Sequence, residues 1–185
     1  MGTVKSLLLG MCFVLGAGTS QTSTVQTTEK GTQWEWQNGT IVVKTPERPA
    51  GQKSVLGLTT PKLEAVRVGF VGLGMRGPGA VERFTYIPGT QVVALCDYEE
   101  ARADKCQELL KKASMPKAAV YSGDKGYEEL CKRDDIDLVY IAADWLHHFP
   151  VAKCALENGK NVAIEVPSAM NLQECWDLIN LSEST

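Results

Sequence analysis

The sequence predicts an α/β fold, in which helices cover both faces of a doubly wound parallel sheet of about five strands. From residue 66 onward, short apolar runs typical of buried strands alternate with segments of helical period. Such alternation is typical of parallel βαβ units with right-handed crossovers. The runs are almost continuously apolar, as expected for strands that are covered on both faces.

The first strand, Val66–Val71, leads into a glycine turn with the pattern G-x-G-x-x-G. In a Rossmann-like dinucleotide fold, Gly72 would make the tight turn, Gly74 would let the backbone approach a pyrophosphate, and Gly77 would let the next helix pack closely. The glycine spacing alone is a weak signal. The preceding strand strengthens it, and Pro78 suits the first turn of a helix. We therefore expect a phosphate-bearing ligand at the N-terminus of that helix.

A second strand, Gln91–Cys96, ends in Asp97, which follows Gly77 by 20 positions. This is about where dinucleotide folds place the acid that binds the adenosine ribose. The alternative is that Asp97 is a solvated N-cap for the helix that begins near Glu99. If its carboxylate faces the ribose, its charge would repel a 2′-phosphate and would favour NAD over NADP.

The remaining elements continue the alternation of strands and helices. Helical period and end signals mark four segments, Glu99–Lys112, Tyr127–Lys132, Phe149–Glu157 and Asn171–Ser184. Short apolar runs mark three more strands, Ala119–Tyr121, Asp137–Ala142 and Asn161–Val166. The last helix is expected to bury an inner face made of Leu172, Cys175, Trp176 and Ile179.

The first 65 residues have a different character. Lys5, an apolar run and then small residues make Met1–Ser20 resemble a cleavable signal peptide, so we expect export to the periplasm or cell surface of a bacterium. The alternative is an ordinary buried or interfacial segment. Residues 21–65 read as a linker with a β-hairpin arm around Asn38-Gly39, and residues 66–185 as the dinucleotide-binding domain. A lone hairpin is marginal in water, so the arm is expected to pack on the main domain or on another subunit of a homo-oligomer.

Composition excludes several other classes of function. The net charge of −3 and the absence of a basic stripe argue against nucleic acid as a partner. Beyond the signal peptide, no apolar run is long enough for a transmembrane segment. The six cysteines form no CxxC pair and lie in apolar patterns, so we interpret them as small buried hydrophobic residues, and we expect no metal site.

Two further segments follow strands and contribute candidate binding residues. In Ala143–His148, His147 and His148 could hydrogen-bond a ribose or nicotinamide and Trp145 could pack on a cofactor. Alternatively, the histidines only cap the next helix and Trp145 lies at the edge of the core. In the second segment, Glu165-Val166-Pro167, the carboxylate lies at the depth of the nicotinamide, or else it is a charge at the strand end that faces solvent. Its proline is a candidate for a cis peptide bond.

Together these segments resemble a known family over residues 66–185. The resemblance is based on the segments VRVGFVGLGMRGPG, DWLHH, ALENGKNV and EVPSAMNLQECWDLI and on Asp97 at the end of the second strand. They are similar to the glucose-fructose oxidoreductase and inositol dehydrogenase superfamily (Gfo/Idh/MocA), and within it to the NAD-dependent α-N-acetylgalactosaminidase-like enzymes of glycoside hydrolase family 109. Most oxidoreductases of the superfamily have Glu-Lys-Pro where this chain has Glu165-Val166-Pro167, and the valine is the pattern of the hydrolase family.

The resemblance implies an NAD-dependent glycosidase acting on a small glycoside or sugar. Bound NAD would oxidise the sugar at C3, a base would remove the acidified proton on C2, the aglycone would leave, and the hydride would return after water adds. The residues implied to contact NAD, besides the three glycines, are Met75, Arg76, Asp97, Trp145, Leu146, His147, His148, Glu165 and Val166. The acid and base residues are implied to lie in a second, substrate-binding domain, so we expect this chain to lack catalytic residues and to be truncated at its C-terminal end. A sugar or polyol oxidoreductase and a non-catalytic NAD-binding module remain alternatives.

Overall fold

The computed structural model describes residues 26–27, 33–44 and 49–185, which divide into two compact units at Lys44/Thr45. In the first unit, β1 (Gln26–Thr27), β2 (Gln33–Gln37) and β3 (Thr40–Val43) form an antiparallel sheet. The β2–β3 hairpin confirms the prediction from Asn38-Gly39, since both turn residues have positive φ, as a two-residue hairpin turn requires. The predicted signal peptide and most of the linker before the hairpin lie outside the described residues.

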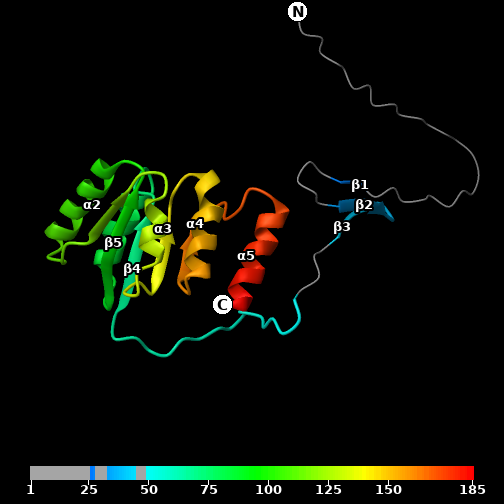
Figure 1. Cartoon of the computed structure of the whole chain (residues 1–185), viewed down its shortest axis with the longest axis horizontal. Helices are drawn as coiled ribbons and strands as arrows, with labels where there is room; N and C mark the ends of the chain where they lie inside the picture. The colour runs from blue at the N-terminus through cyan, green and yellow to red at the C-terminus, as the bar shows by residue number, and fades with distance from the viewer. Residues whose placement is uncertain (1–25, 28–32, 45–48) are drawn as a thin grey trace, which may run out of the picture. The chain divides into compact units, whose positions relative to one another are not determined.

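The second unit contains the predicted parallel sheet (Figure 1). Its five strands are β4 (Val66–Val71), β5 (Thr90–Asp97), β6 (Ala119–Ser122), β7 (Leu138–Ile141) and β8 (Asn161–Ile164). Their order in the sheet is β6-β5-β4-β7-β8, and every pairing is parallel. The strand order therefore reverses beside β4. In open α/β sheets this reversal opens a crevice for ligands outside the carboxyl ends of the strands.

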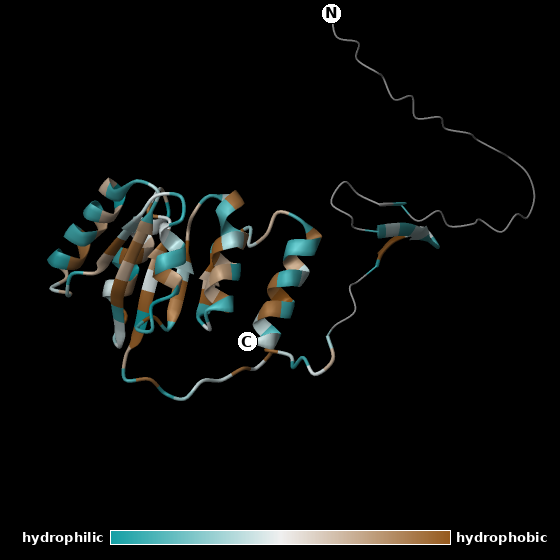
Figure 2. Cartoon of the chain, in the orientation of Figure 1, coloured by the Kyte–Doolittle hydropathy of each residue, from teal (hydrophilic) through white to brown (hydrophobic). Residues whose placement is uncertain are grey.

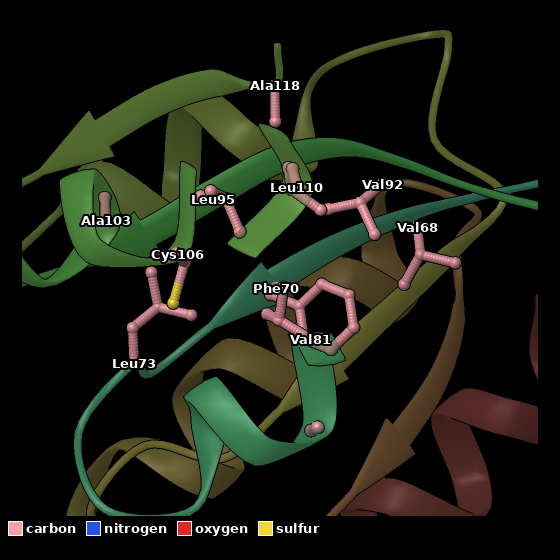
Figure 3. Packing of buried hydrophobic residues seen from close by; sticks show 11 residues of the cluster. Val68, Phe70, Leu73, Val81, Val92, Leu95, Ala103, Cys106, Leu110 and Ala118 are labelled. Carbon is pink, nitrogen blue, oxygen red and sulfur yellow. The ribbon is translucent and has the colours of Figure 1, made fainter. Parts of the chain in front are cut away.

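Five helices accompany the sheet, namely α1 (Gly77–Thr85), α2 (Glu100–Lys112), α3 (Gly126–Cys131), α4 (Trp145–Glu157) and α5 (Leu172–Ser184). Side chains alternate between the two faces of β4, because Phe70 packs with α1 and α2 whereas Val71 packs with α3 and α4. Figure 3 shows the first of these clusters, in which Phe70 and Leu95 meet Val81 and Leu110 from the helices. The strands are accordingly the most hydrophobic elements of the unit (Figure 2).

Two predicted boundaries were wrong, one by four residues and one by two. Helix α4 begins at Trp145, four residues before the predicted start, because the Asp144 side chain accepts a hydrogen bond from the Leu146 backbone and caps the helix there. Strand β8 ends at Ile164, so Glu165 and Val166 follow the strand instead of belonging to it.

The predicted inner face of α5 was also wrong in part. The side chains of Leu172, Cys175 and Ile179 are exposed, and no residue of the helix is fully buried. Leu178 packs on the core instead, and Trp176 is half-buried. Helix α5 stands at the end of the row α3, α4, α5 (Figure 1). It packs against α4, and the Gln52 side chain donates a hydrogen bond of 2.8 Å to its Asn180 carbonyl. The spacing of apolar residues therefore predicted an amphipathic helix, but it did not predict which side of the helix packs on other elements.

An ion pair joins the amino ends of β4 and β7. The Arg67 backbone and side chain donate three hydrogen bonds, of 2.6 to 2.9 Å, to the Asp137 carboxylate. The Asp137 backbone returns one bond of 2.9 Å to the Arg67 carbonyl. The side-chain hydrogen bond from Arg67 lowers the pKa of Asp137 below its ordinary value of 3.8, although burial opposes this shift.

The lowered pKa of Asp137 predicts a specific dependence of stability on pH. Because the folded state favours the ionised carboxylate, the contribution is complete above about pH 5 and is lost as the pH falls through 4 and below. We expect Asp137→Asn to lower the free energy of unfolding at pH 7 and to lose this part of the acid dependence. Denaturant unfolding at pH 7, 4 and 3 measures it, with Asp134→Asn, an exposed neighbour, as the control for charge. A difference between Asp137→Asn and the unchanged chain that is equally large at pH 3 and pH 7 would contradict the assignment.

Candidate functional site

A cavity of about 950 Å³ opens at the carboxyl edge of the parallel sheet. Its walls come from the segments that follow all five strands, and its volume lies at the upper end of the range for small-molecule sites. The predicted binding residues that line it are Gly72, Gly74, Met75, Arg76, Asp97, Trp145, His147, His148, Glu165 and Val166. Gly77 and Leu146 do not line it. The sheet therefore gathers most of the predicted residues, although they are spread over 95 positions of the sequence (from 72 to 166), around one cavity.

A glycine is present at each of the three positions of the turn for a different structural reason. Gly72 has φ +91°, and a Cβ there would lie 2.3 Å from the Ala143 backbone nitrogen. A Cβ at Gly77 would lie 2.1 Å from the Gly72 carbonyl oxygen, so α1 packs directly on the turn. At Gly74, a Cβ would meet only the Arg102 guanidinium, at 3.6 Å. Two glycines are therefore required by the fold itself, whereas the third leaves room on the wall of the cavity.

The N-terminus of α1 follows this turn and is open to an anion. Arg76 is the N-cap residue, but its side chain makes no capping hydrogen bond, and Pro78 occupies the first turn. The side chains of Asp144 and Asn171 cap α4 and α5, whereas α2 and α3 lack a side-chain cap as α1 does, so what distinguishes α1 is its place directly after the glycine turn. Free backbone N–H groups and the positive end of the helix dipole favour a negatively charged group at such a position. The glycine turn, the uncapped helix and the cavity together fit the diphosphate of a dinucleotide.

Asp97 forms part of the cavity wall and is buried, with 6% of its surface exposed. Its carboxylate accepts hydrogen bonds from the Leu73 backbone at 2.6 Å and the Glu99 backbone at 3.0 Å. The Arg102 guanidinium donates a third bond at 3.3 Å. The N-cap residue of α2 is Glu99, so the alternative reading of Asp97 as a solvated N-cap is wrong.

The two histidines at the start of α4 differ in their surroundings. His148 is 1% exposed, and its Nδ1 and Nε2 lie 2.7 Å from the Pro167 carbonyl oxygen and 2.9 Å from that of Ala143. It therefore joins the β7–α4 segment to the β8–α5 segment across the cavity wall. Neither histidine caps the helix, because Asp144 does.

His147 is the more open of the two, with 43% of its side chain exposed. Its Nδ1 lies 2.5 Å from Asp144 Oδ2, and its Nε2 lies 3.7 Å from Asp124 Oδ1. Burial opposes ionisation of Asp144, but hydrogen bonds from His147 and the Leu146 backbone hold the pKa of Asp144 below its ordinary value. The exposed face of His147 makes it the histidine better placed to meet a ligand in the cavity.

Aromatic and aliphatic side chains surround the mouth of the cavity. Trp145 is 61% exposed, so it does not belong to the edge of the core, and Val166 is 83% exposed. Met75 and Tyr98 line the same cavity and are also exposed. Large exposed apolar side chains around a hollow are typical of ligand sites.

Glu165 points back toward the sheet. Its carboxylate accepts a hydrogen bond of 2.8 Å from the Tyr140 hydroxyl, so it is not a free charge at the strand end. Burial, and then this carboxylate, raise the pKa of Tyr140, while Arg83 acts in the opposite direction. The next peptide bond, Val166–Pro167, is cis, as the sequence suggested.

The cysteines give the cavity no reactive thiol. Burial, with a smaller effect of the Asp97 charge, raises the pKa of Cys96 to about 12, so its thiol stays protonated at neutral pH. The prediction of buried cysteines holds for Cys96, Cys106 and Cys131, but Cys175 is exposed and Cys154 is only half-buried. Among residues 26–27, 33–44 and 49–185, no group of His, Cys, Asp or Glu side chains could hold a metal ion. Within the same ranges, none of the helices combines the length and apolar character needed to cross a membrane.

Sequence reasoning assigned no binding role to five polar or aromatic residues of the cavity, namely Tyr98, Arg102, Asp124, Tyr127 and Asp144. Asp124 follows β6, and position alone could have indicated it, because every parallel strand ends at the same edge. Arg102 lies in the first turn of α2, where its reach back to Asp97 depends on a rotamer that no sequence pattern reveals.

Comparison with known proteins agrees with this geometry. The pattern of an oxidoreductase family with an NAD-binding Rossmann fold matches residues 66–185. Glycosyl hydrolase family 109 proteins 4 and 5 of Phocaeicola vulgatus are 78% and 79% identical over the whole chain, which spans 36% of their length. Glycosyl hydrolase family 109 protein 1 of Bacteroides thetaiotaomicron is 56% identical over 98% of the chain and 38% of its own length.

Solved structures share the same fold. Myo-inositol dehydrogenase from Lactobacillus casei, solved with NAD(H) and myo-inositol, has a TM-score of 0.57 at 24% identity, covering 65% of this chain and 34% of its own. Biliverdin reductase from Synechocystis, solved with biliverdin and NADP+, has a TM-score of 0.55 at 28% identity, covering 64% of this chain and 35% of its own. The two structures were solved with different nicotinamide cofactors, NAD(H) in the first and NADP+ in the second.

Proposed function

Because this chain belongs to the Gfo/Idh/MocA oxidoreductase family with an NAD-binding Rossmann fold, we propose that it is the cofactor-binding part of a family 109 glycosidase. The substrate would be an α-N-acetylgalactosaminide or a related glycoside, hydrolysed with tightly bound NAD. The observation that carries the proposal is the cavity at the carboxyl edge, where the glycine turn faces the buried Asp97. The identity to family 109 proteins and the valine at position 166 favour the glycosidase over other activities of the superfamily.

The residues present would hold the parts of the cofactor in order along the cavity. The uncapped start of α1 and Gly74 would bind the diphosphate, and Asp97 would accept a hydrogen bond from the adenosine ribose. The nicotinamide end would then lie toward His147, Glu165 and Val166. NAD, when bound, supplies an acceptor that takes a hydride from the sugar and returns it.

The Glu165 carboxylate has a positioning role in this proposal. The hydrogen bond from Tyr140 fixes one of its oxygens at 2.8 Å, so the carboxylate is oriented before a ligand arrives. His148 holds the following Pro167 carbonyl oxygen in the same way. Both contacts would keep the β8–α5 segment in one conformation at the nicotinamide end, which is how a binding site limits the ordering cost of its ligand.

Export, which the N-terminal sequence predicts, is compatible with NAD if the reaction is redox-neutral. NAD is mainly a cytoplasmic metabolite, but a hydride that returns in each turnover requires no external pool of cofactor. We propose that the cofactor is loaded once and stays bound in the periplasm or at the cell surface. The chain spans 36% of the length of its relatives, family 109 proteins 4 and 5. We propose that the acid and base residues of the whole enzyme lie in the part that corresponds to the rest of these relatives, and we expect these 185 residues to bind cofactor without turning over glycosides.

Release of the bound nucleotide tests the proposal. The chain, purified without added cofactor, is denatured, and the supernatant is assayed for NAD(H) and NADP(H) by chromatography and mass. We expect NAD(H) in the supernatant, and rebinding when NADH is added to protein refolded without it. A chain that retains its fold but neither carries nor rebinds nicotinamide nucleotide would overturn the proposed function.

A sugar or polyol oxidoreductase is the second candidate, because the fold is shared with a myo-inositol dehydrogenase. The two activities differ in their products. With the gene product that contains this chain, the glycosidase releases an aglycone from an aryl glycoside with no net absorbance change at the nicotinamide band. The oxidoreductase accumulates NADH from a free sugar or polyol, and a chain that binds NAD with neither outcome is the non-catalytic module.

Trp145 offers an optical signal for cofactor binding. Because this exposed indole lines the cavity, a bound dinucleotide should contact it and quench its fluorescence. We expect Trp145→Ala to lose most of the quenching and to weaken NADH binding about 10-fold, the size of a good aromatic contact. Trp176→Phe is the control, since Trp176 lies in α5 and does not line the cavity. Undiminished quenching in Trp145→Ala would place the bound nucleotide elsewhere.

A further inference from the structure

The adenosine end of the cavity contains both of the residue types that usually distinguish NAD sites from NADP sites. An acid after the second strand of such a sheet binds the free ribose hydroxyls of NAD, whereas an arginine nearby accommodates the 2′-phosphate of NADP. Here Asp97 supplies the acid, and Arg102 lies in the first turn of the next helix, lining the same cavity. The sequence alone therefore leaves the role of the arginine undecided.

The geometry shows how the two charges are combined. Arg102 Nη1 lies 3.3 Å from Asp97 Oδ1, and its Nη2 lies 3.0 Å from Glu99 Oε1. One guanidinium is thus shared between two carboxylates, one buried and one exposed. The remaining arginine of the cavity lining, Arg76, is the N-cap residue of α1. Two negative charges around one positive charge leave this end of the cavity with a net negative charge, which disfavours a phosphate.

The guanidinium nevertheless lies where a ligand could reach it. Arg102 is partly exposed, and its Nη1 is 3.6 Å from the position that a Cβ of Gly74 would take, so it reaches over the glycine turn. Arginine presents paired N–H donors that match a phosphate group well. The carboxylates, and not distance from the cavity, are what keep it from serving as a phosphate receptor.

We propose that Arg102 is a masked 2′-phosphate receptor, and that Asp97 and Glu99 together set the preference for NAD by occupying its guanidinium. The inference rests on the proposed cofactor site and extends it to a residue and a specificity that the site alone does not assign. Removing the two acidic charges frees the arginine and converts the cavity to an NADP site. If Arg102 were only a partner in a surface ion pair, replacing it would not change the preference between NAD and NADP.

The test compares the binding of NADH and NADPH to the chain, read from the fluorescence of the reduced nicotinamide. The unchanged chain is expected to bind NADH at least 100-fold more tightly than NADPH. In Asp97→Asn/Glu99→Ala, NADPH should gain affinity and reach or exceed NADH. Adding Arg102→Gln to that variant should weaken NADPH binding by about 10- to 100-fold, the range for losing charge-assisted hydrogen bonds, and leave NADH binding nearly unchanged. Lys105→Gln, an exposed cation on the same helix, is the matched control and should affect neither cofactor.

The outcomes separate this inference from the proposed function. If NADH binds the unchanged chain but Arg102→Gln does not weaken NADPH binding in the double variant, the inference is overturned and the cofactor site stands. If neither nucleotide binds the folded, unchanged chain, the proposed function and this inference fail together. Should the double variant not fold, Glu99→Ala alone decides the matter, because Glu99 is exposed. It should raise NADPH affinity several-fold in the presence of Arg102 and not in Arg102→Gln.

Discussion

Alanine at position 77 should cost the parallel-sheet unit about 3 kcal/mol of its free energy of unfolding, the upper part of the usual range for overpacking. Its Cβ would lie 2.1 Å from the Gly72 carbonyl oxygen and 2.9 Å from the Gly72 carbonyl carbon. Both neighbours are backbone atoms of a turn that is itself held by a 2.9 Å hydrogen bond from the Gly72 N–H to the Cys96 carbonyl. Relief therefore requires α1 to move away from β4. Thermal and urea unfolding followed by circular dichroism measure the loss.

Gly74→Ala is the matched control and should separate binding from stability. Its Cβ would meet only the Arg102 guanidinium at an ordinary contact distance, so the melting temperature should stay within about 2 °C. The added methyl group would stand on the cavity wall where the diphosphate is proposed to approach, so NADH affinity should fall at least 10-fold. Equal losses of stability in the two variants would refute the steric argument, and unchanged NADH affinity in Gly74→Ala would refute the proposed place of the diphosphate.

The fold was largely predictable because its determinants are local. Runs such as Val66–Val71 are apolar enough to be buried on both faces, and the alternation with helices leaves few topologies other than a parallel sheet. Boundaries failed where one side chain decides them, as when Asp144 caps α4 so that the helix begins four residues before the predicted start at Phe149. The prediction of which side of α5 is buried was wrong in part. The spacing of apolar residues indicates that the helix is amphipathic, but the side that is buried depends on neighbours from elsewhere in the chain.

The residues of the candidate site that lie at or just after the ends of strands were predictable from the sequence. Asp97 is the last residue of β5, Gly72 and Glu165 follow β4 and β8 directly, and parallel strands bring their carboxyl ends to one edge. The partners of these residues were not predictable, since the bond from Tyr140 to Glu165 and the approach of Arg102 to Asp97 depend on side-chain directions in three dimensions. A sequence can thus indicate which residues surround a cavity before it can indicate how their charges are balanced.

The two adjacent histidines of α4 should respond to substitution in opposite ways. His148 is almost completely buried, and both of its ring nitrogens lie within 3 Å of carbonyl oxygens, of Pro167 and Ala143. His148→Ala would leave a void and remove the only hydrogen-bond partners given to these two oxygens by a side chain of the described part of the chain. We expect a loss of about 3 kcal/mol in the free energy of unfolding and a melting temperature lower by about 10 °C.

His147→Ala serves as the comparison, because the same ring is removed one position earlier from a half-exposed site. Its stability should change by less than about 1 kcal/mol, since the contacts with Asp144 and Asp124 are partly solvated. NADH affinity should nevertheless fall several-fold, since the ring faces the cavity. If His147→Ala destabilises the fold as strongly as His148→Ala, the contacts of His147 stabilise the fold more than partly solvated contacts should. If His148→Ala leaves the melting temperature unchanged, His148 does not join the two segments of the cavity wall. In that case the rigid β8–α5 segment, on which the placement of Glu165 depends, must be held by other contacts.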